Sequence, residues 1–600
     1  MKFQKEKFIL FINILISFFL GALIWDYIKF EFHDPQIIGI YSENQYNSLN
    51  DIVRYIVFIS LPILFYIVTK LYFKVDLLIG LKDFFSDEKL PYSKRNKYSY
   101  FFFSLLLVFL ILDFLSLTFP EYSLDSYHDG QKLSSAYKSF LDGSLWSGSY
   151  VTVGIFYETL SSKFIWLLFD NVSIGLSRYA LIFYIFIFKI LLLILIFQIT
   201  NYLNLDDFYK NIFFIFNATF LNQLCDYNTA SVDLISYREI PIILTSIFFL
   251  ILLKSKNNNF ILFLISILSV GSMLWGIDRG LVCNLLIITI LIYLLSTKNY
   301  KKFYLLIFYL LLNWIIFISL ANDEFMYFYD NTITIFKEMN YIHGLIHPTP
   351  FTDDPNSARA SKTLISISIS ILISLDLIFN KKKHYSSHLK KIFLFLSIIS
   401  VLSYLYALGR SDGPHIKNSF GYPITFLFIY ISYSFLLAIY KKNIKYSKIT
   451  LSLFALIIVA IYSEINFKKI ISYESRFTEY VNLKDEFFLS KKEKILVDKI
   501  NPITSKYECI QLLSNDAALY YLLRKKSCTK YYFVWSASSS NIQKKFKKEL
   551  SNTKLILEGG EKNNWDLPLK SKLPIIYKHV VDNFLEQKID KNWRLFLREK

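Results

Sequence analysis

Apolar stretches long enough to cross a lipid bilayer recur between residues 8 and 463 of this 600-residue chain. A membrane-spanning helix needs about 20 predominantly apolar residues. Stretches of about that length occupy residues 8–28, 52–73, 99–119, 177–199, 240–254, 260–275, 280–296, 303–320, 363–380, 391–408, 422–440 and 449–463, and a weaker one occupies residues 211–224. The pattern predicts a polytopic α-helical membrane protein with thirteen transmembrane helices.

The positively charged residues indicate how these helices are oriented, because Lys and Arg in short loops stay cytoplasmic. If residues 1–7 are cytoplasmic and the predicted helices alternate in direction, most loop Lys and Arg residues fall on the cytoplasmic side. We therefore expect the N-terminus inside and the C-terminus outside. Omitting the helix at 211–224 would invert every later loop and lose this asymmetry.

From about residue 464 the apolar runs shorten and charged residues intersperse. Residues 530–535 and 554–557 are typical of strands, and residues 541–550 are typical of a helix. We expect a small extracytoplasmic α/β domain at 464–600, after an N-terminal two-helix transmembrane module at 1–98 and a transmembrane catalytic core at 99–463. Cys509 and Cys528 fall in this domain, and an oxidising compartment would allow them to pair, but their spacing does not show that they approach each other.

Composition supports a membrane protein, since 54% of the residues are hydrophobic. The formal net charge of +18 arises from short tracts between apolar runs and not from one continuous basic face, which argues against a nucleic-acid partner. The abundance of Lys, Ile, Asn, Phe and Tyr is typical of an AT-rich bacterial genome. We therefore expect a multi-pass protein of the bacterial inner (cytoplasmic) membrane.

The most unusual polar stretch is Leu124-Asp-Ser-Tyr-His-Asp-Gly130, which follows the apolar stretch 99–119. The carboxylates of Asp125 and Asp129 and the imidazole of His128 lie within five residues. Ionisable groups beside a lipid-spanning helix are costly to keep unless they have a function. Residues 131–164 then space apolar side chains three and four apart, which favours helices lying in the membrane interface, with a partly exposed loop as the alternative.

The other unusual polar groups lie at the predicted extracytoplasmic ends of helices. They are Asp226, Asn228, Asp233, Arg238, Glu239, Asp278, Arg279, His343, His347, Arg410, Asp412 and His415. A turn between two helix ends is polar in any case, so each group also has a purely structural interpretation; Asp278 and Arg279, for example, would suit an ion pair that closes a hairpin. The predicted topology nevertheless gathers these groups at one membrane face.

Residues 128–146, His-Asp-Gly-Gln-Lys-Leu-Ser-Ser-Ala-Tyr-Lys-Ser-Phe-Leu-Asp-Gly-Ser-Leu-Trp, resemble the start of the first large extracytoplasmic loop in the GT-C superfamily of integral-membrane glycosyltransferases. This superfamily includes protein O-mannosyltransferases and lipid A aminoarabinose transferases, and its loop begins with an acidic motif, commonly Asp-Glu or Asp-Asp. The resemblance implies that residues 120–162 form the first catalytic loop, with Asp129 as the catalytic base. Gly130 stands where the family has a second acid, and Asp125 could replace that acid.

The resemblance also implies a polyprenyl-phosphate-linked sugar donor, inversion at the transferred sugar, and a lipid, glycan or protein of the cell envelope as acceptor. A carboxylate can take the proton of the attacking hydroxyl, and Arg can stabilise the charge that develops on the departing phosphate. Arg238, Arg279 and Arg410 lie on the expected side, with Asp278 beside them, and His343, His347 or His415 could contact the phosphate. Mg²⁺ or Mn²⁺ held by Asp129 and Asp125 is a further possibility.

Two other functions stay open. An O-antigen polymerase or ligase would place its key residues in the late loop 321–361, which contains His343 and Arg359. A lipid or glycan transporter would carry charged groups at mid-helix depth. The sequence identifies neither the sugar nor the acceptor.

Overall fold

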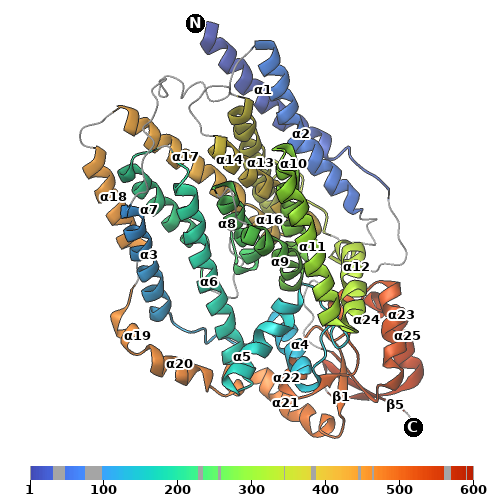
Figure 1. Cartoon of the computed structure of the whole chain (residues 1–600). Helices are drawn as coiled ribbons and strands as arrows, with labels where there is room; N and C mark the ends of the chain where they lie inside the picture. The colour runs from blue at the N-terminus through green and yellow to red at the C-terminus, as the bar shows by residue number, and fades with distance from the viewer. Residues whose placement is uncertain are drawn as a thin grey trace.

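The fold is a bundle of long helices with a small domain at one end (Figure 1). The computed structural model describes residues 2–31, 47–73, 97–203, 205–227, 234–254, 259–343, 345–379, 387–442, 447–462, 465–559, 569–589 and 591–598. The thirteen apolar stretches correspond to α1 (Lys2–Trp25), α2 (Ser48–Phe73), α3 (Lys97–Ser116), α6 (Ile174–Thr200), α7 (Asp207–Gln223), α8 (Ile240–Lys254), α9 (Asn259–Trp275), α10 (Ile277–Ser296), α11 (Tyr300–Ala321), α13 (Pro355–Phe379), α14 (Ser387–Ser403), α17 (Gly421–Lys442) and α18 (Ser447–Tyr462). Each predicted stretch is therefore helical.

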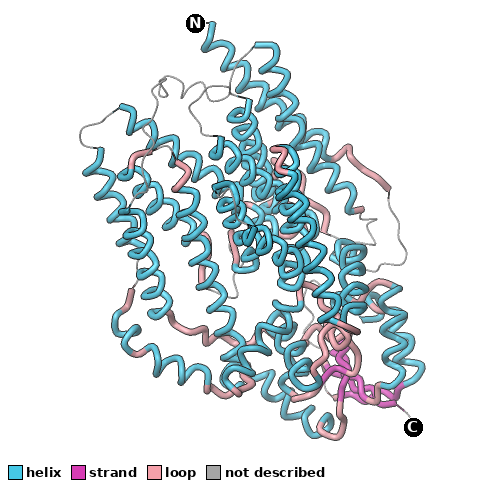
Figure 2. The backbone as a smooth tube through the Cα atoms, in the orientation of Figure 1, coloured by secondary structure: helices cyan, strands magenta, loops and turns pink. Residues whose placement is uncertain are grey.

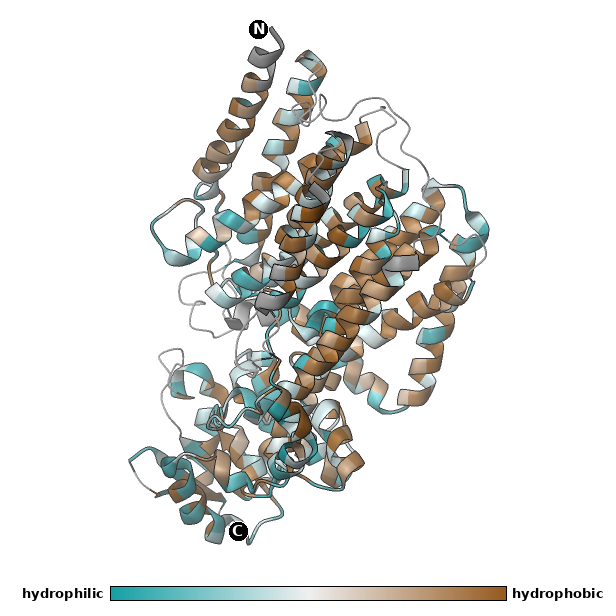
Figure 3. Ribbon diagram, turned by 90° about the vertical axis from the view of Figure 1, so that its left-hand side faces the viewer, coloured by the Kyte–Doolittle hydropathy of each residue, from teal (hydrophilic) through white to brown (hydrophobic). Residues whose placement is uncertain are grey.

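Eight helical stretches within the described residues are long and apolar enough to cross a membrane. Two shorter apolar helices, Tyr100–Ser116 and Asn259–Trp275, accompany them. Hydrophobic residues dominate the bundle, whereas the domain that contains the C-terminus is more polar (Figure 3). The chain is thus a polytopic helical membrane protein, and the number and direction of its crossings stay predictions.

The bundle has its largest core around α6, where Phe188, Leu192 and Ile196 are buried. The first two helices pack on each other and on α13, and Trp25 and Phe58 share a smaller core with Tyr404. The predicted boundaries of the N-terminal module, the catalytic core and the C-terminal domain are not tested by these contacts.

Helices also form after the acidic stretch, as expected. They are α4 (His128–Asp142), the one-turn π-helix η3 (Phe156–Leu160) and α5 (Ser161–Phe169). However, α4 is buried over residues 130–139, because Leu133, Ala136 and Tyr137 pack against Ala518 and Tyr521 of the C-terminal domain. The apolar face of α4 therefore covers protein, and not the membrane interface that the spacing suggested.

The strands lie in the C-terminal domain (Figure 2). They form a five-stranded sheet in the order β2 (Lys526–Ser527), β1 (Cys509–Leu513), β3 (Leu555–Gly559), β5 (Trp593–Arg598) and β4 (Phe584–Lys588). β1 is parallel to β2 and β3, whereas β5 is antiparallel to β3 and β4. The predicted strand at 554–557 and the predicted helix at 541–550 are confirmed as β3 and α23 (Ser540–Glu549).

The predicted strand at 530–535 is wrong. The backbone carbonyl groups of this segment form hydrogen bonds with the first loop and with a side chain, and not with a neighbouring strand. Lys530 O accepts from Tyr150 N at 2.8 Å, and Tyr531 O accepts from Gln511 Nε2 at 3.0 Å. Tyr531 and Tyr532 are both buried, between the sheet and the first loop. Next to this segment, Cys509 and Cys528 form a disulfide with their Cα atoms 5.0 Å apart, so the open question of their pairing is answered.

Candidate active site

Asp129 lies in the first turn of α4 and is paired with a buried arginine. Its Oδ2 accepts hydrogen bonds from Arg178 Nη2 at 2.8 Å and from the backbone nitrogen of Asp125 at 3.2 Å. Among the described residues, no hydrogen-bond donor contacts Oδ1 of Asp129, and the side chain of Asp129 is 14% exposed. Asp129 is therefore held in one orientation with one oxygen left for a substrate.

Arg178 was not singled out from the sequence, although it begins the apolar stretch that became α6. Its side chain is 2% exposed and also donates to the backbone oxygens of Tyr122 at 2.7 Å and Ser123 at 3.2 Å. The guanidinium lies 4.1 Å from the ring centre of Tyr122. Arg178 thus fixes the chain that enters α4, and an arginine within an apolar run was the signal for it.

Gly130, which stands where a second acid was expected, is required by close packing. A Cβ atom at this position would lie 3.0 Å from Ala517 C and from Ala518 Cα, and nearer still to the backbone nitrogen of Ala518. Ala518 belongs to α22 (Ala518–Leu522) of the C-terminal domain. The domain therefore occupies the space that a second carboxylate would need.

Asp125 and His128 form a more exposed pair at the start of α4. Asp125 Oδ1 accepts from the backbone nitrogens of Tyr127 and His128, both at 3.0 Å, and Oδ2 lies 2.6 Å from His128 Nδ1. Burial alone would raise the pKa of Asp125, but these hydrogen bonds and the imidazole lower it to about 2. Asp125 thus caps the helix end, which is the structural interpretation of this residue.

Lys132, Tyr157 and Arg238 continue the site from α4 towards the bundle. Lys132 is buried with its Nζ 4.9 Å from the centre of the Tyr157 ring, and the Arg238 guanidinium lies 5.3 Å from the same ring. Burial would raise the pKa of the Tyr157 phenol, but the charges of Lys132 and Arg238 lower it. Burial likewise opposes the charge on Lys132, while Tyr157 and Asp129 raise its pKa. Lys132 and Tyr157 were not predicted as site residues, because both are ordinary members of an amphipathic pattern.

Arg238 connects to an ion-pair network at the N-terminal end of α10, in which Arg279 and Glu239 are buried. Arg238 Nη2 lies 2.9 Å from Asp278 Oδ2, which also pairs with Arg279 Nη1. Arg279 Nε donates to Glu239 Oε1 at 2.9 Å, and Nη2 donates to Asn418 at 3.1 Å. Its guanidinium lies 3.5 Å from the centre of the Tyr406 ring. All three guanidinium nitrogens of Arg279 are thus engaged within the protein.

Asn418 lies on α16 (Gly413–Ser419), the helix that also carries His415. Asp412 caps this helix, pairs with Arg410 Nε at 2.6 Å and lies 2.6 Å from His415 Nδ1. Burial would raise the pKa of Asp412, but His415 and Arg410 lower it to about 2. Arg410 and His415, 28% and 29% exposed, therefore form a group of their own around Asp412, at the helix whose Asn418 binds Arg279.

The two histidines of the loop 321–361 lie elsewhere. His347 is buried against the first two helices: its Nε2 lies 2.6 Å from Tyr404 Oη and its ring centre 4.9 Å from that of Trp25. Burial lowers its pKa to about 4. His343 is the last residue of α12 (Glu324–His343), and its side chain lies outside the described residues. The structure thus joins Arg238, Asp278 and Arg279 by direct contacts and brings Arg238 to Lys132 of α4 through Tyr157. Arg410 and His415 lie at α16, whose Asn418 binds Arg279, and His347 lies apart from all of them.

Glu158, which the sequence did not single out, ties the first loop to the C-terminal domain. Its carboxylate is fully buried and accepts from Thr152 N at 2.8 Å, Thr152 Oγ1 at 3.0 Å, Val153 N, and Tyr532 Oη at 2.8 Å. Burial raises its pKa. Glu158 therefore organises the turn before η3 that presents Tyr157.

The carboxylates of Asp125 and Asp129 do not offer a ligand set for Mg²⁺ or Mn²⁺. Asp125 is engaged by three nitrogens, and the Oδ2 atom of Asp129 faces the Arg178 guanidinium. In the described part of the chain, no three His, Cys, Asp or Glu side chains are grouped to hold an ion. Three of the four carboxylate oxygens of these two residues are thus already occupied by nitrogen donors of the protein.

No protein-family model and no curated protein matches the chain. Among solved structures, ArnT from Cupriavidus metallidurans bound to undecaprenyl phosphate is 12% identical, covers 84% of this chain and 98% of that chain, and has a TM-score of 0.42. The Archaeoglobus fulgidus oligosaccharyltransferase tethered to an acceptor peptide with the NVT sequon is 12% identical, covers 84% and 74%, and also has a TM-score of 0.42. Both are GT-C glycosyltransferases, the superfamily that residues 128–146 resemble. At TM-scores below 0.5 this likeness decides neither the fold nor the chemistry of this chain.

Proposed function

We propose that the protein is a GT-C-type membrane glycosyltransferase that moves a sugar from a polyprenyl-phosphate donor to an acceptor of the cell envelope. One observation carries the proposal: α4 holds both the Asp129 carboxylate and the buried ammonium of Lys132. The Tyr157 ring lies between this ammonium and the guanidinium of Arg238. A single site thus offers an acceptor for a proton and cations for an anionic leaving group.

The chemistry follows from these positions. The acceptor hydroxyl attacks the anomeric carbon, the bond from that carbon to the phosphate oxygen breaks, and the hydroxyl proton passes to Oδ1 of Asp129. Lys132 and Arg238 stabilise the charge on the departing polyprenyl phosphate, with the Tyr157 hydroxyl between them as a hydrogen-bond donor. Attack opposite to the leaving group inverts the anomeric centre.

Arg279 serves this site as a positioning residue. Its nitrogens are bound to Glu239, Asp278 and Asn418, and Asp278 in turn holds Arg238. Arg410 and His415 border this network with partly exposed side chains and are further candidates for contact with the donor. Arg238 and Lys132 thus contact the phosphate, and Arg279 supports Arg238 through Asp278.

We place the reaction on the extracytoplasmic face of a bacterial inner membrane. The distribution of Lys and Arg supports this side, because basic loops stay cytoplasmic. The Cys509–Cys528 disulfide supports it independently, since disulfides persist in oxidising compartments. The C-terminal domain that carries the disulfide packs directly on α4.

Mass spectrometry of envelope lipids and glycans, with and without the gene in the host, would test the function and name the transferred group. Complementation with Asp129→Asn should fail to restore the missing mass, because loss of a general base costs about 10²–10⁴ in rate. Asp125→Asn is the matched control, since that residue caps the helix and should restore the mass. An unchanged envelope in the deletion strain would refute the function, and full restoration by Asp129→Asn would refute only the base assignment.

A further inference from the structure

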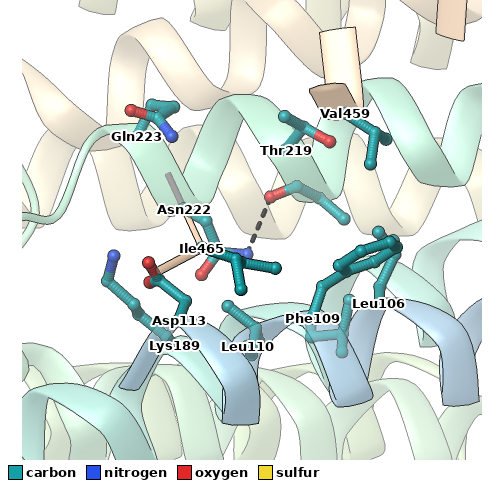
Figure 4. Close-up of a pocket in the computed structure, with 12 residues that line it drawn as sticks. Leu106, Phe109, Leu110, Asp113, Lys189, Thr219, Asn222, Gln223, Val459 and Ile465 are labelled. Carbon is teal, nitrogen blue, oxygen red and sulfur yellow. Dashed lines mark hydrogen bonds between the residues drawn. The ribbon is translucent and has the colours of Figure 1, made fainter. Parts of the chain in front are cut away.

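A cavity with apolar walls and a few polar groups lies away from the candidate active site, between α3, α6, α7 and α18 (Figure 4). Its volume is about 80 Å³, and it is partly open to the surroundings. Its lining includes Asp113, Gln223 and Ile465, which lie close to the ends of α3, α7 and α18. The cavity thus lies where α3, α7 and α18 end, whereas Lys189 and Leu193 line it from the middle of α6 (Ile174–Thr200).

Lys189 of α6 supplies the positive charge of this cavity. The residue is 7% exposed, and its Nζ lies 4.3 Å from the centre of the Tyr227 ring. Among the described residues its ammonium has no salt bridge or hydrogen bond to a protein acceptor. A charged group inside a membrane bundle is costly, so a lysine with this environment calls for a ligand.

Acceptor groups face the same space. Asn222 Nδ2 donates to Ala218 O at 2.8 Å, whereas its buried Oδ1 has no partner in the described part of the chain. Figure 4 shows the Asp113 carboxylate and the Lys189 ammonium extending into the same part of the cavity as Asn222. A carboxylate can accept several hydrogen bonds, so Asp113 has capacity beyond any single contact.

The cavity therefore offers a cation and anionic or neutral acceptors side by side, with apolar walls from Leu106, Leu110 and Val459. An anion alone would meet the carboxylate of Asp113, and a cation alone would meet Lys189. A zwitterion satisfies both groups. Water could fill part of the space, at about 30 Å³ a molecule, but would not neutralise the lysine.

We propose that this cavity binds the headgroup of a zwitterionic phospholipid that carries a phosphodiester and a primary ammonium, as in phosphatidylethanolamine. Lys189 contacts the phosphate, and Asp113 and Asn222 accept from the ammonium. The apolar walls of α3 and α18 receive the upper part of the acyl chains. This lipid is a structural ligand, and its site does not depend on the proposed glycosyltransferase activity.

Native mass spectrometry of the full-length purified protein, titrated with phosphatidylethanolamine, phosphatidylcholine or phosphatidylglycerol, tests the proposal. Phosphatidylethanolamine should bind at least about tenfold more tightly than the other two, since phosphatidylcholine lacks N–H donors and phosphatidylglycerol lacks the cation. Lys189→Met should weaken phosphatidylethanolamine binding about tenfold. Lys391→Met is the matched control, because Lys391 also lies over a tyrosine ring, 5.0 Å from the centre of Tyr293.

Each remaining outcome decides the matter. Equal binding of the three lipids, or phosphatidylethanolamine binding that Lys189→Met leaves unchanged, would overturn the proposal. If the protein instead binds phosphatidylglycerol most tightly and loses this preference in Lys189→Met, the result would overturn the zwitterionic-lipid proposal and identify the cavity as a site for anionic lipids. If Lys189→Met does not fold, Asn222→Ala gives the same test through the ammonium side of the headgroup, and the wild-type lipid preference stands as evidence by itself.

Discussion

Replacing Gly130 by Ala tests whether the close contact between α4 and α22 sets the position of Asp129. The new methyl group would lie 3.0 Å from Ala517 C and Ala518 Cα and closer to the Ala518 nitrogen, whereas ordinary contacts are 3.4–4 Å. The two helices must therefore move apart by more than 0.4 Å, the difference between 3.4 and 3.0 Å, because the Ala518 nitrogen lies nearer than the other two atoms. The contact consists of backbone atoms, so a side-chain rotation cannot relieve it.

The cost can be worked from the same geometry. Forcing an extra methyl group into a packed contact costs about 1–3 kcal/mol, and the better helix propensity of Ala returns about 1 kcal/mol. The separation would also strain the bonds from Ser134 Oγ to Ala517 O, 2.6 Å, and from Ala518 N to Ser126 O, 3.1 Å. Each such bond contributes about 1 kcal/mol. We expect a net destabilisation of about 2 kcal/mol, concentrated at this interface.

Thermal unfolding in lipid nanodiscs measures the loss of stability, and hydrogen exchange measures its location. Gly130→Ala should lower the unfolding temperature and speed exchange at the amide of Ala518. Gly271→Ala is the matched control, because a Cβ at this helical position meets no atom within 4 Å. It should leave stability unchanged or slightly raised. Gly130→Ala should also restore less of the envelope product in the deletion strain, because the movement of α4 displaces Asp129.

Two results would refute this reasoning. The first is a Gly130→Ala protein with wild-type unfolding temperature and wild-type protection at Ala518. The second is a fully active Gly130→Asp protein, because a second acid at this position cannot be accommodated while α22 is in place. Either result would mean that α4 and α22 are not in close contact in the working protein.

Four further predictions concern residues outside this contact. Arg178→Met leaves Asp129 without its buried partner and should cost about 3–5 kcal/mol in thermal unfolding, whereas Arg178→Lys should lose less. The pKa of His347 is lowered from 6.5 to about 4 in the folded protein. As the pH falls below 6.5, the unfolded chain is therefore protonated at this residue before the folded protein is, and the free energy of unfolding should decrease until the pH reaches about 4. The loss should be about 3 kcal/mol and absent in His347→Gln, as pH-dependent unfolding would show. Reduction of the Cys509–Cys528 disulfide, which spans 19 residues, should destabilise the C-terminal domain by about 3 kcal/mol and expose two thiols to labelling. Lys132→Met should raise the KM for the polyprenyl-phosphate donor about tenfold, measured once that donor is known, with Lys163→Met as the control.

The helices were predictable because an apolar segment in a bilayer must satisfy all its backbone hydrogen bonds within the protein, and a single segment can do so only as a helix. The stretch at 211–224 became α7 although it is short and weakly apolar. Asp129 was a candidate for the same reason, as an acid in the loop that follows an apolar helix, and its role as the base stays a prediction. The sequence could not show that Arg178 turns back to meet it, since this pairing depends on how residues 117–127 fold between α3 and α4.

Segment 530–535 shows the limit of local patterns. Its run of aromatic residues resembles a strand, yet the chain uses Tyr531 and Tyr532 to fill the space between the sheet and the first loop. The deciding partners are Tyr150 and Gln511, which lie far from it in the sequence. Alternation of apolar and polar residues along the chain does not distinguish a strand with one buried face from a segment whose side chains fill the space between two layers of structure.

The position of the candidate base therefore depends on parts of the chain that are distant in sequence. Ser134 Oγ donates to Ala517 O, Lys138 Nζ donates to Thr529 O at 3.1 Å, and Tyr532 Oη donates to Glu158 at 2.8 Å. These partners are buried, so separating the first loop from the C-terminal domain would leave polar groups unsatisfied on both sides, at about 1–3 kcal/mol each. The C-terminal domain is thus no appendage to the bundle: it forms the wall against which α4 holds Asp129, and it excludes the second acid that the family motif would place at residue 130.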